Sequence, residues 1–211
     1  MSLVGRGSAE QGELAGRTGQ VLNVINDSTK WIVSSLVFAV LVWNPNFKSA
    51  WWVSGAIINS FVCKTLKLVI NETRPESSRR REPGMPSSHA NSLAFLSIFS
   101  ALALYSERSI PGTTVVAATI VASAMFLSWL RVALGDHTTA QVLAGFALGS
   151  SLAAAWWGIG TATAYPLLTS SPNLRLLLCA VTVVAIGLFA GANLAPKVLA
   201  VLGMSGGSKE A

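Results

Sequence analysis

The sequence predicts an all-α polytopic membrane protein, a helical bundle of about six transmembrane helices with its polar clusters at one membrane face. The 211 residues are 52% hydrophobic and only 11% charged, and their mean hydropathy is +0.55. Soluble domains carry about 25% charged residues, more than twice this share. Six apolar stretches approach the length of about 20 residues that a helix needs to cross a bilayer. Together these observations predict an integral membrane protein.

The predicted helices are separated by turn residues. The first is the weakest, because its apolar core runs only from Trp31 to Trp43. Asn44-Pro45-Asn46 forms a turn signal after it, and Pro111-Gly112 forms another. Small residues in the fifth helix would permit close helix packing; they are Gly145, Ala147, Gly149, Ser150 and Ser151. The six predicted helices cover residues 29–46, 50–70, 89–106, 112–134, 138–160 and 174–202.

One membrane domain, residues 29–202, is expected between two flexible tails. Residues 1–28 contain acidic residues and lack the apolar core of a secretory signal, so they are interpreted as an N-terminal tail. Residues 203–211 form the C-terminal tail. The N-terminal tail is not acid-poor enough for a clear transit peptide, and it fits a segment left after processing.

The charge balance points to anionic partners. Lys plus Arg outnumber Asp plus Glu by 15 to 9. Part of this excess lies in a single loop, 71–88, which favours anionic substrates or lipid headgroups. A nucleic-acid partner is not expected, because the sequence has no soluble basic domain to present a groove. The basic residues of this loop are Arg74, Arg79, Arg80 and Arg81.

Counting the crossings brings three polar clusters together. The second helix ends at the first cluster, and the third helix begins at the second cluster. The fourth helix ends, and the fifth begins, at the third cluster. In a bundle whose helices alternate in direction, these four ends lie on the same side of the membrane. The sequence therefore predicts that the clusters converge at one membrane face.

The first cluster contains Lys67 and Arg74, which are seven residues apart and are followed by Pro75. Two helical turns would place both cations on one face of the helix. A Lys charge and an Arg fork at a helix end suit the oxygens of a phosphate. Taken alone, the pair fits better with two cations that reach the membrane boundary along their apolar stems.

The second cluster, Pro86-Ser87-Ser88-His89, precedes an apolar run. Ser87 or Ser88 can cap the helix, whose first N–H groups form an anion site. His89 in the first turn could donate a proton to a leaving oxygen. A plain serine cap beside an interfacial histidine explains the pattern equally well.

The third cluster joins Arg131 to His137, with Gly135 between them to let the backbone bend. His137 could attack phosphorus and form a phosphohistidine. Gln141 is four residues further on and could accept a hydrogen bond from the imidazole, although an amide cannot stabilise an imidazolium as a carboxylate would. A satisfied polar histidine at a helix end is the competing interpretation.

In order and spacing, the three clusters resemble the three-part signature of the type 2 phosphatidic acid phosphatase superfamily. The resemblance covers about residues 29–160. Within this family, His-Thr-x-x-Gln-Val resembles both the dolichyl diphosphate phosphatase branch and the plant plastid branch. Three other segments together are most similar to the plastid lipid phosphate phosphatases of the epsilon type: Ser128-Trp129-Leu130-Arg131, Gly-Met-Pro-Ser-Ser-His-Ala and Lys30-Trp31. A location in the plastid inner envelope membrane is implied by that similarity.

The resemblance implies a role for each residue. His137 corresponds to the nucleophile and His89 to the general acid that protonates the leaving group. The phosphate ligands would be Lys67, Arg74, Ser88 and Arg131, with Ser87 and backbone amides nearby. The family works without a metal ion or another cofactor, so none is expected.

Two positions depart from the family pattern. Ser88 replaces the usual glycine of the middle motif, and Gln141 replaces the usual aspartate four residues after the nucleophile. The second departure removes the usual histidine–carboxylate pair, which suggests slower turnover or an altered pH dependence.

Three hypotheses follow. The first is a metal-independent phosphatase that converts phosphatidate to diacylglycerol and phosphate through a phosphohistidine, with Gln141 as the orienting partner. The second keeps the mechanism but takes a polyprenyl or dolichyl diphosphate. The third is a non-catalytic membrane protein whose basic loop binds anionic lipid. The partners are therefore a phospholipid or an isoprenoid phosphate in the bilayer.

Overall fold

The computed structural model describes the backbone of residues 3–78, 82–106 and 111–201, and side chains from residue 19 to residue 192 within these ranges. Arg79, Arg80 and Arg81 of the basic loop, and the predicted tail 203–211, lie outside the described residues. The described residues form helices and contain no strand, which confirms the predicted all-α class. The helices are α1 (Leu3–Trp43), α2 (Phe47–Ile70), α3 (Ser88–Ser106), α4 (Thr113–Ala133), α5 (Thr139–Ile159), the π-helical turn η1 (Gly160–Ala164), α6 (Tyr165–Ser170) and α7 (Pro172–Val201).

Within the described residues, five helical segments are long and apolar enough to cross a membrane: Gly19–Trp43, Phe47–Ile70, Thr113–Ala133, Thr139–Ser170 and Pro172–Ala192. The sixth long helix, α3, falls short in hydropathy because it carries several serines and His89. It packs against α4, α5 and α2, and its side chains include Phe95 and Phe99 of the buried core. Neighbouring helices therefore shield α3 from lipid, which permits its polar composition.

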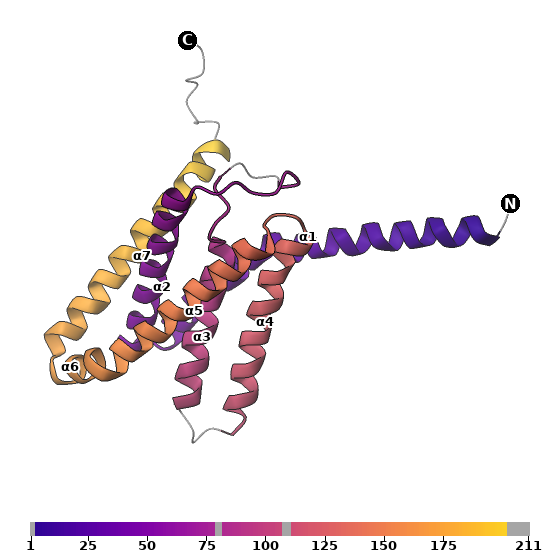
Figure 1. The fold of residues 1–211 in the computed structure, drawn as a ribbon. Coiled ribbons are helices and arrows are strands. Elements are labelled where there is room, and N and C mark those ends of the chain that lie inside the picture. The colour runs from indigo at the N-terminus through magenta and orange to yellow at the C-terminus, as the bar shows by residue number, and fades with distance from the viewer. Residues whose placement is uncertain (1–2, 79–81, 107–110, 202–211) are drawn as a thin grey trace, which may run out of the picture.

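The ends of the helices confirm the predicted convergence (Figure 1). The end of α2, the start of α3 and the connection between α4 and α5 lie at one end of the bundle. The end of α3, the start of α4 and the short helix α6 lie at the opposite end. Polar clusters that are far apart in sequence thus meet at a single end of the molecule.

The N-terminal helix differs from expectation. We predicted a flexible tail over residues 1–28, whereas α1 is helical from Leu3, and its first part extends away from the other helices (Figure 1). The apolar residues from Val21 to Ile25 lengthen the first span toward its N-terminus. This extension matters for the site, because Asn26 and Thr29 are buried.

Close packing between α3 and α5 sets the position of the site. A side chain at Gly145 would collide with the backbone of Ser87, and one at Gly149 would collide with the backbone of Asn91. The small residues of the fifth span therefore allow the close approach that the sequence predicts. A backbone hydrogen bond of 2.9 Å from Ser87 N to Gln141 O then ties the start of α3 to the start of α5.

The far end of the bundle is held by aromatic residues. The rings of Trp51 and Trp156 stack with centroids 4.3 Å apart, and each indole N–H donates to the backbone oxygen of the other tryptophan. These two side chains pack between α2 and α5, where each indole N–H finds a partner.

Candidate active site

Arg74 reaches the site from a loop. We predicted that two helical turns place Lys67 and Arg74 on one face, but α2 ends at Ile70, and Asn71 caps it in the left-handed conformation with φ of 47°. Asparagine adopts this conformation more readily than most residues. The chain then turns, with a hydrogen bond of 2.6 Å from Gly84 N to Glu72 O joining the two ends of the loop. Arg74 and Lys67 therefore do not share a helical face.

A tight turn between α4 and α5 presents His137. Gly135 has a φ of 72°, which is the bend predicted at this residue. The backbone N–H groups of Asp136 and His137 both donate to Arg131 O, at 3.0 and 3.1 Å. The turn is thus anchored at the end of α4, and His137 is 3% exposed.

The two ring nitrogens of His137 have different partners. Nδ1 is 3.1 Å from Gln141 Oε1, and Nε2 is 3.0 Å from Arg74 Nη1. A guanidinium can only donate, so Nε2 must accept and the ring proton must lie on Nδ1. His137 is therefore held as the tautomer whose Nε2 carries the lone pair.

The environment of His137 keeps this imidazole neutral. Burial, followed by the Arg74 cation, lowers the pKa of His137 from 6.5 to about 3, and the Arg131 and Lys67 cations act in the same direction. The hydrogen bond to Gln141 opposes these effects but is outweighed. The ring is therefore unprotonated, and nucleophilic in principle, across the neutral pH range.

Gln141 is fully buried, and its side-chain amide has four hydrogen-bond partners. Its Nε2 donates to Glu72 Oε1 at 2.8 Å and to Thr73 O at 2.7 Å. Because the amide nitrogen is committed to these acceptors, Oε1 must face His137. Gln141 also forms a capping box with Thr138 at the start of α5.

Glu72 is a member of this network that the sequence analysis did not identify. Its carboxylate stands behind Gln141, so the order of contacts is Glu72, Gln141, His137 and Arg74. The only signal in the sequence was its position, two residues before Arg74. An exposed carboxylate in a basic loop gives no indication of its partner without the fold.

Arg131 is buried and paired. Its Nη1 is 2.8 Å from Asp136 Oδ2 and donates to Asn26 Oδ1 at 2.9 Å. Asn26 lies on α1, in the segment we assigned to a tail. A short polar run, Asn26-Asp27 with Thr29, inside an apolar stretch was the available signal for it.

The remaining predicted ligands surround the start of α3. Lys67 Nζ donates to Pro83 O at 2.7 Å. Ser87 precedes α3, is fully buried, and its Oγ lies 3.5 Å from Ala90 N, so Ser87 rather than Ser88 occupies the cap position. Ser88 Oγ is 3.6 Å from the thiol of Cys63. Within the described residues, no three His, Cys, Asp or Glu side chains form a group that could hold a metal ion.

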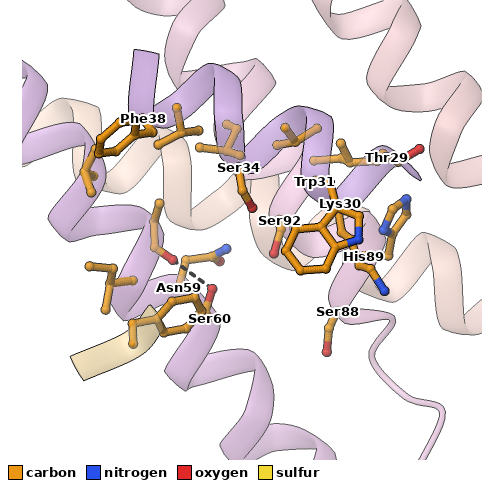
Figure 2. A pocket seen from close by; sticks show the side chains of 18 of the residues that line it. Thr29, Lys30, Trp31, Ser34, Phe38, Asn59, Ser60, Ser88, His89 and Ser92 are labelled. Atoms are coloured by element: carbon orange, nitrogen blue, oxygen red, sulfur yellow. Dashed lines mark hydrogen bonds between the residues drawn. The ribbon is translucent and has the colours of Figure 1, made fainter. Parts of the chain in front are cut away.

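His89 lies on a different side of the site from the network around Gln141. Together with Ser88 and Arg131, it lines a cavity of about 600 Å³ between α1, α2, α3 and α7. Figure 2 shows this cavity with Ser34 and Phe38 of α1 on one side and Asn59 and Ser60 of α2 on the other. The structure thus places Arg74 and Gln141 in direct contact with His137. Arg131 and His89 line the same cavity.

Comparison with known proteins places this geometry in a family. The PAP2 superfamily profile matches residues 49–165, more than half of the chain. This chain belongs to the PAP2 superfamily. The match includes every residue predicted for the site, from Lys67 to Gln141.

Several curated proteins are similar to this PAP2 chain. Arabidopsis thaliana lipid phosphate phosphatase epsilon 2, chloroplastic, is 34% identical over 80% of this chain and 59% of its own length. Its epsilon 1 counterpart is 33% identical over 66% of this chain and 50% of its own length. Homo sapiens dolichyldiphosphatase 1 is 28% identical over 66% of this chain and 64% of its own length. The chain therefore spans between half and two thirds of these relatives.

A solved structure shares the fold. The transmembrane PAP2-type phosphatidylglycerolphosphate phosphatase of Bacillus subtilis superposes with a TM-score of 0.56 at 19% identity, covering 69% of this chain and 78% of its own. This likeness supports the membrane-helical architecture. The chain thus shares its family with lipid phosphatases and its fold with a membrane phosphatase of that family.

Proposed function

We propose that this protein hydrolyses phosphatidate to diacylglycerol and phosphate through a phosphohistidine on His137, without a metal ion. The observation that carries the proposal is the state of His137. Its Nδ1–H is held by Gln141 and its Nε2 lone pair faces the Arg74 guanidinium. An imidazole in this state is ready to attack an electrophile that Arg74 binds.

Substrate binding would release the nucleophile. In this structure, Arg74 donates to His137 Nε2 at 3.0 Å. A phosphate oxygen is a stronger acceptor for a guanidinium than a neutral imidazole, because both partners are charged. Binding of the phosphate would therefore draw Arg74 onto an oxygen and leave the Nε2 lone pair directed at phosphorus.

Three cations would hold the phosphoryl oxygens. In this structure, Lys67 donates to the backbone oxygen of Pro83, and Arg74 donates to the backbone oxygen of Glu82. Arg131 is paired with Asp136. The Ser88 N–H at the start of α3 adds a donor where the helix dipole favours an anion. A dianionic phosphate can recruit Lys67 and Arg74 by replacing these neutral acceptors with charged oxygens, and Arg131 can donate to it with other N–H groups while it keeps Asp136.

The reaction would proceed in two displacements. His137 Nε2 forms a bond to phosphorus while the bond to the glycerol oxygen breaks, and His89 gives that oxygen a proton to release diacylglycerol. Water then attacks phosphorus, the P–N bond breaks, and the proton of the water returns to His89. The net change is hydrolysis of one ester bond.

Glu72 would support the charged intermediate. When Nε2 bonds to phosphorus, the ring becomes cationic, and the amide of Gln141 offers only a dipole. The Glu72 carboxylate polarises that amide through the bond to Gln141 Nε2. We infer that Glu72 and Gln141 together replace the single carboxylate usual in the family.

A diphosphate substrate is the second candidate. The similarity to dolichyldiphosphatase 1, at 28% identity, favours it. The similarity to the epsilon phosphatases, at 34%, favours a lipid phosphate.

The names of the plant relatives also support our proposal that the protein resides in a plastid envelope membrane, which a fluorescent fusion in plant cells would test.

Phosphate release from phosphatidate in detergent micelles containing EDTA tests the proposal, with His137→Ala as the control. We expect release by the parent protein alone. Release from a dolichyl diphosphate but not from phosphatidate would establish the second candidate. Lipid binding without release of phosphate from either lipid would instead indicate a non-catalytic binder.

A further inference from the structure

The cavity beside His89 contains one buried polar side chain that its surroundings do not satisfy. Asn59 of α2 is 2% exposed and lines this cavity. Among the described residues, neither its Oδ1 nor its Nδ2 has a hydrogen-bond partner. An unsatisfied buried amide costs about 1–3 kcal/mol, so such groups generally have a partner in the functional state.

The neighbours of Asn59 do not remove this cost. Ser60 lines the same cavity, but its hydroxyl donates to Ala56 O at 3.0 Å (Figure 2). The side chains deeper in the cavity are apolar and include Phe38, Val53 and Leu96. A ligand with a polar group at the level of Asn59 and hydrocarbon beyond it would therefore match this cavity.

The position of Asn59 relative to the site defines that ligand. Asn59, Cys63 and Lys67 follow one another at intervals of four residues along α2, so they lie on one side of the helix. Cys63 contacts Ser88, the residue before His89. At 1.5 Å per residue, Asn59 lies about 6 Å deeper in the bundle than this level.

If its phosphate is bound at His137, a lipid would extend along α2 past Lys67 and Cys63 to Asn59. In a glycerophospholipid, ester groups follow the phosphate within a few covalent bonds, and acyl chains continue from there. An isoprenoid phosphate has only hydrocarbon after its phosphate. The Asn59 amide can form a hydrogen bond with the ester groups of a glycerophospholipid. When an isoprenoid phosphate binds, the amide stays buried against hydrocarbon without a partner.

We propose that Asn59 binds the glycerol-ester region of the substrate and selects glycerolipid phosphates over isoprenoid phosphates. The Nδ2 group donates to an ester carbonyl, and Oδ1 accepts from a free glycerol hydroxyl where an acyl chain is missing. The inference deepens the proposed function and rests on it for the placement of the phosphate.

The variant Asn59→Leu tests it, because leucine has nearly the same volume and needs no partner. The reading is kcat/KM for phosphatidate and for an isoprenoid monophosphate, which share the same reacting group. We expect phosphatidate to lose about 10-fold, the value of one hydrogen bond, and the isoprenoid phosphate to change less than about twofold or to improve. Ser60→Ala, which removes an already satisfied hydroxyl from the same cavity, should change neither.

Thermal unfolding separates a binding role from a structural one. Removing an unsatisfied amide should leave the midpoint of Asn59→Leu unchanged or higher. A lower midpoint, or an equal loss for both lipids, would overturn the inference by making Asn59 a structural residue. An unchanged ratio of the two kcat/KM values would also overturn it.

A binding measurement keeps this test independent of turnover. In the His137→Ala background, the shift of the unfolding midpoint by each lipid is compared with and without Asn59→Leu. We expect the variant to reduce the shift caused by phosphatidate alone, and equal shifts would overturn the inference. An inactive parent protein would contradict the proposed function but would leave this comparison decisive for Asn59.

Discussion

The two sides of the site differ in how their buried polar groups are satisfied. On the side of His137, each side chain has a partner from within the protein, and the contacts run from Glu72 through Gln141 and His137 to Arg74. On the side of His89, the cavity is largely apolar, and Asn59 has no partner among the described residues. The protein itself satisfies the contacts on the His137 side, whereas it leaves the Asn59 amide on the His89 side without a partner among the described residues.

This difference separates chemistry from recognition. A nucleophile must be held in one tautomer and one orientation before the substrate arrives, since reorganisation during the reaction slows it. A lipid subsite instead gains specificity from a group that only the correct ligand satisfies. Substitutions on the His137 side should therefore lower kcat/KM equally for all substrates. Substitutions on the His89 side should change the ratio of kcat/KM between two substrates.

The largest effect is expected for the two histidines. His137→Ala and His89→Ala should each reduce phosphatidate turnover by about 10³-fold or more, as removal of members of a catalytic unit does. A substrate with a nitrophenolate leaving group, which needs no proton, should restore the first displacement in His89→Ala but not in His137→Ala. This step is measured as a rapid burst of nitrophenolate, whereas phosphate release should stay slow in both variants.

Equal rescue of the two variants would contradict the assigned roles. Full phosphatidate activity in either variant would remove that histidine from the mechanism altogether.

An intermediate effect is expected at Gly84, which packs on the amide of Gln141. The Cβ of an alanine at this position would collide with Gln141. Displacement of the amide would misorient His137, and misplacement of about 1 Å can cost about 100-fold in rate. We expect Gly84→Ala to lower kcat by about 10- to 100-fold for every lipid phosphate tested.

Gly158→Ala is the matched control, because open space surrounds this glycine on α5. Its turnover should equal that of the parent protein. If Gly84→Ala altered only the ratio of kcat/KM between two substrates, it would contradict the proposed separation of the two sides.

A smaller effect, on the pH profile, is expected when Gln141 becomes a carboxylate. The pKa of His137 lies near 3, so protonation of this ring does not limit the parent enzyme at mildly acidic pH. A carboxylate at 141 stabilises the imidazolium and raises this pKa. In Gln141→Glu, the acid limb of kcat/KM should therefore move to higher pH, and an unchanged limb would exclude Gln141 as the orienting partner.

Exchange of the two network residues sharpens this test. Gln141→Glu alone places two carboxylates side by side, and they repel. In the double variant Glu72→Gln, Gln141→Glu, one amide and one carboxylate remain, so activity at neutral pH should recover relative to Gln141→Glu while the acid limb stays shifted. Lack of any recovery would argue that the two side chains do not act through each other.

The sequence predicted the convergence of the polar clusters better than it predicted the path of the chain between them. The alternation of apolar helices was sufficient to bring His137, Arg74 and Gln141 together, because helix direction fixes which ends meet. It was not sufficient to place Arg74, which lies in the loop after the left-handed cap at Asn71 and not on a helical face shared with Lys67. A cap of this kind depends on local backbone geometry that the spacing of Lys67 and Arg74 does not encode.

The residues that sequence analysis missed depend on tertiary contacts. Asn26 reaches Arg131 only because α1 begins near the N-terminus and packs beside α4. Glu72 gains its role from a loop that folds back over α5, and Asn59 gains its role from a cavity. Each is an ordinary polar residue in sequence, and only its surroundings distinguish it.

Trapping of the phosphoenzyme tests the central claim most directly. The protein is mixed with phosphatidate labelled at phosphorus, quenched in alkali, and digested for mass spectrometry. We predict an acid-labile, alkali-stable phosphoryl group on His137 that is absent from His137→Ala. Rapid turnover with no label on His137, or a label on a serine instead, would contradict the account.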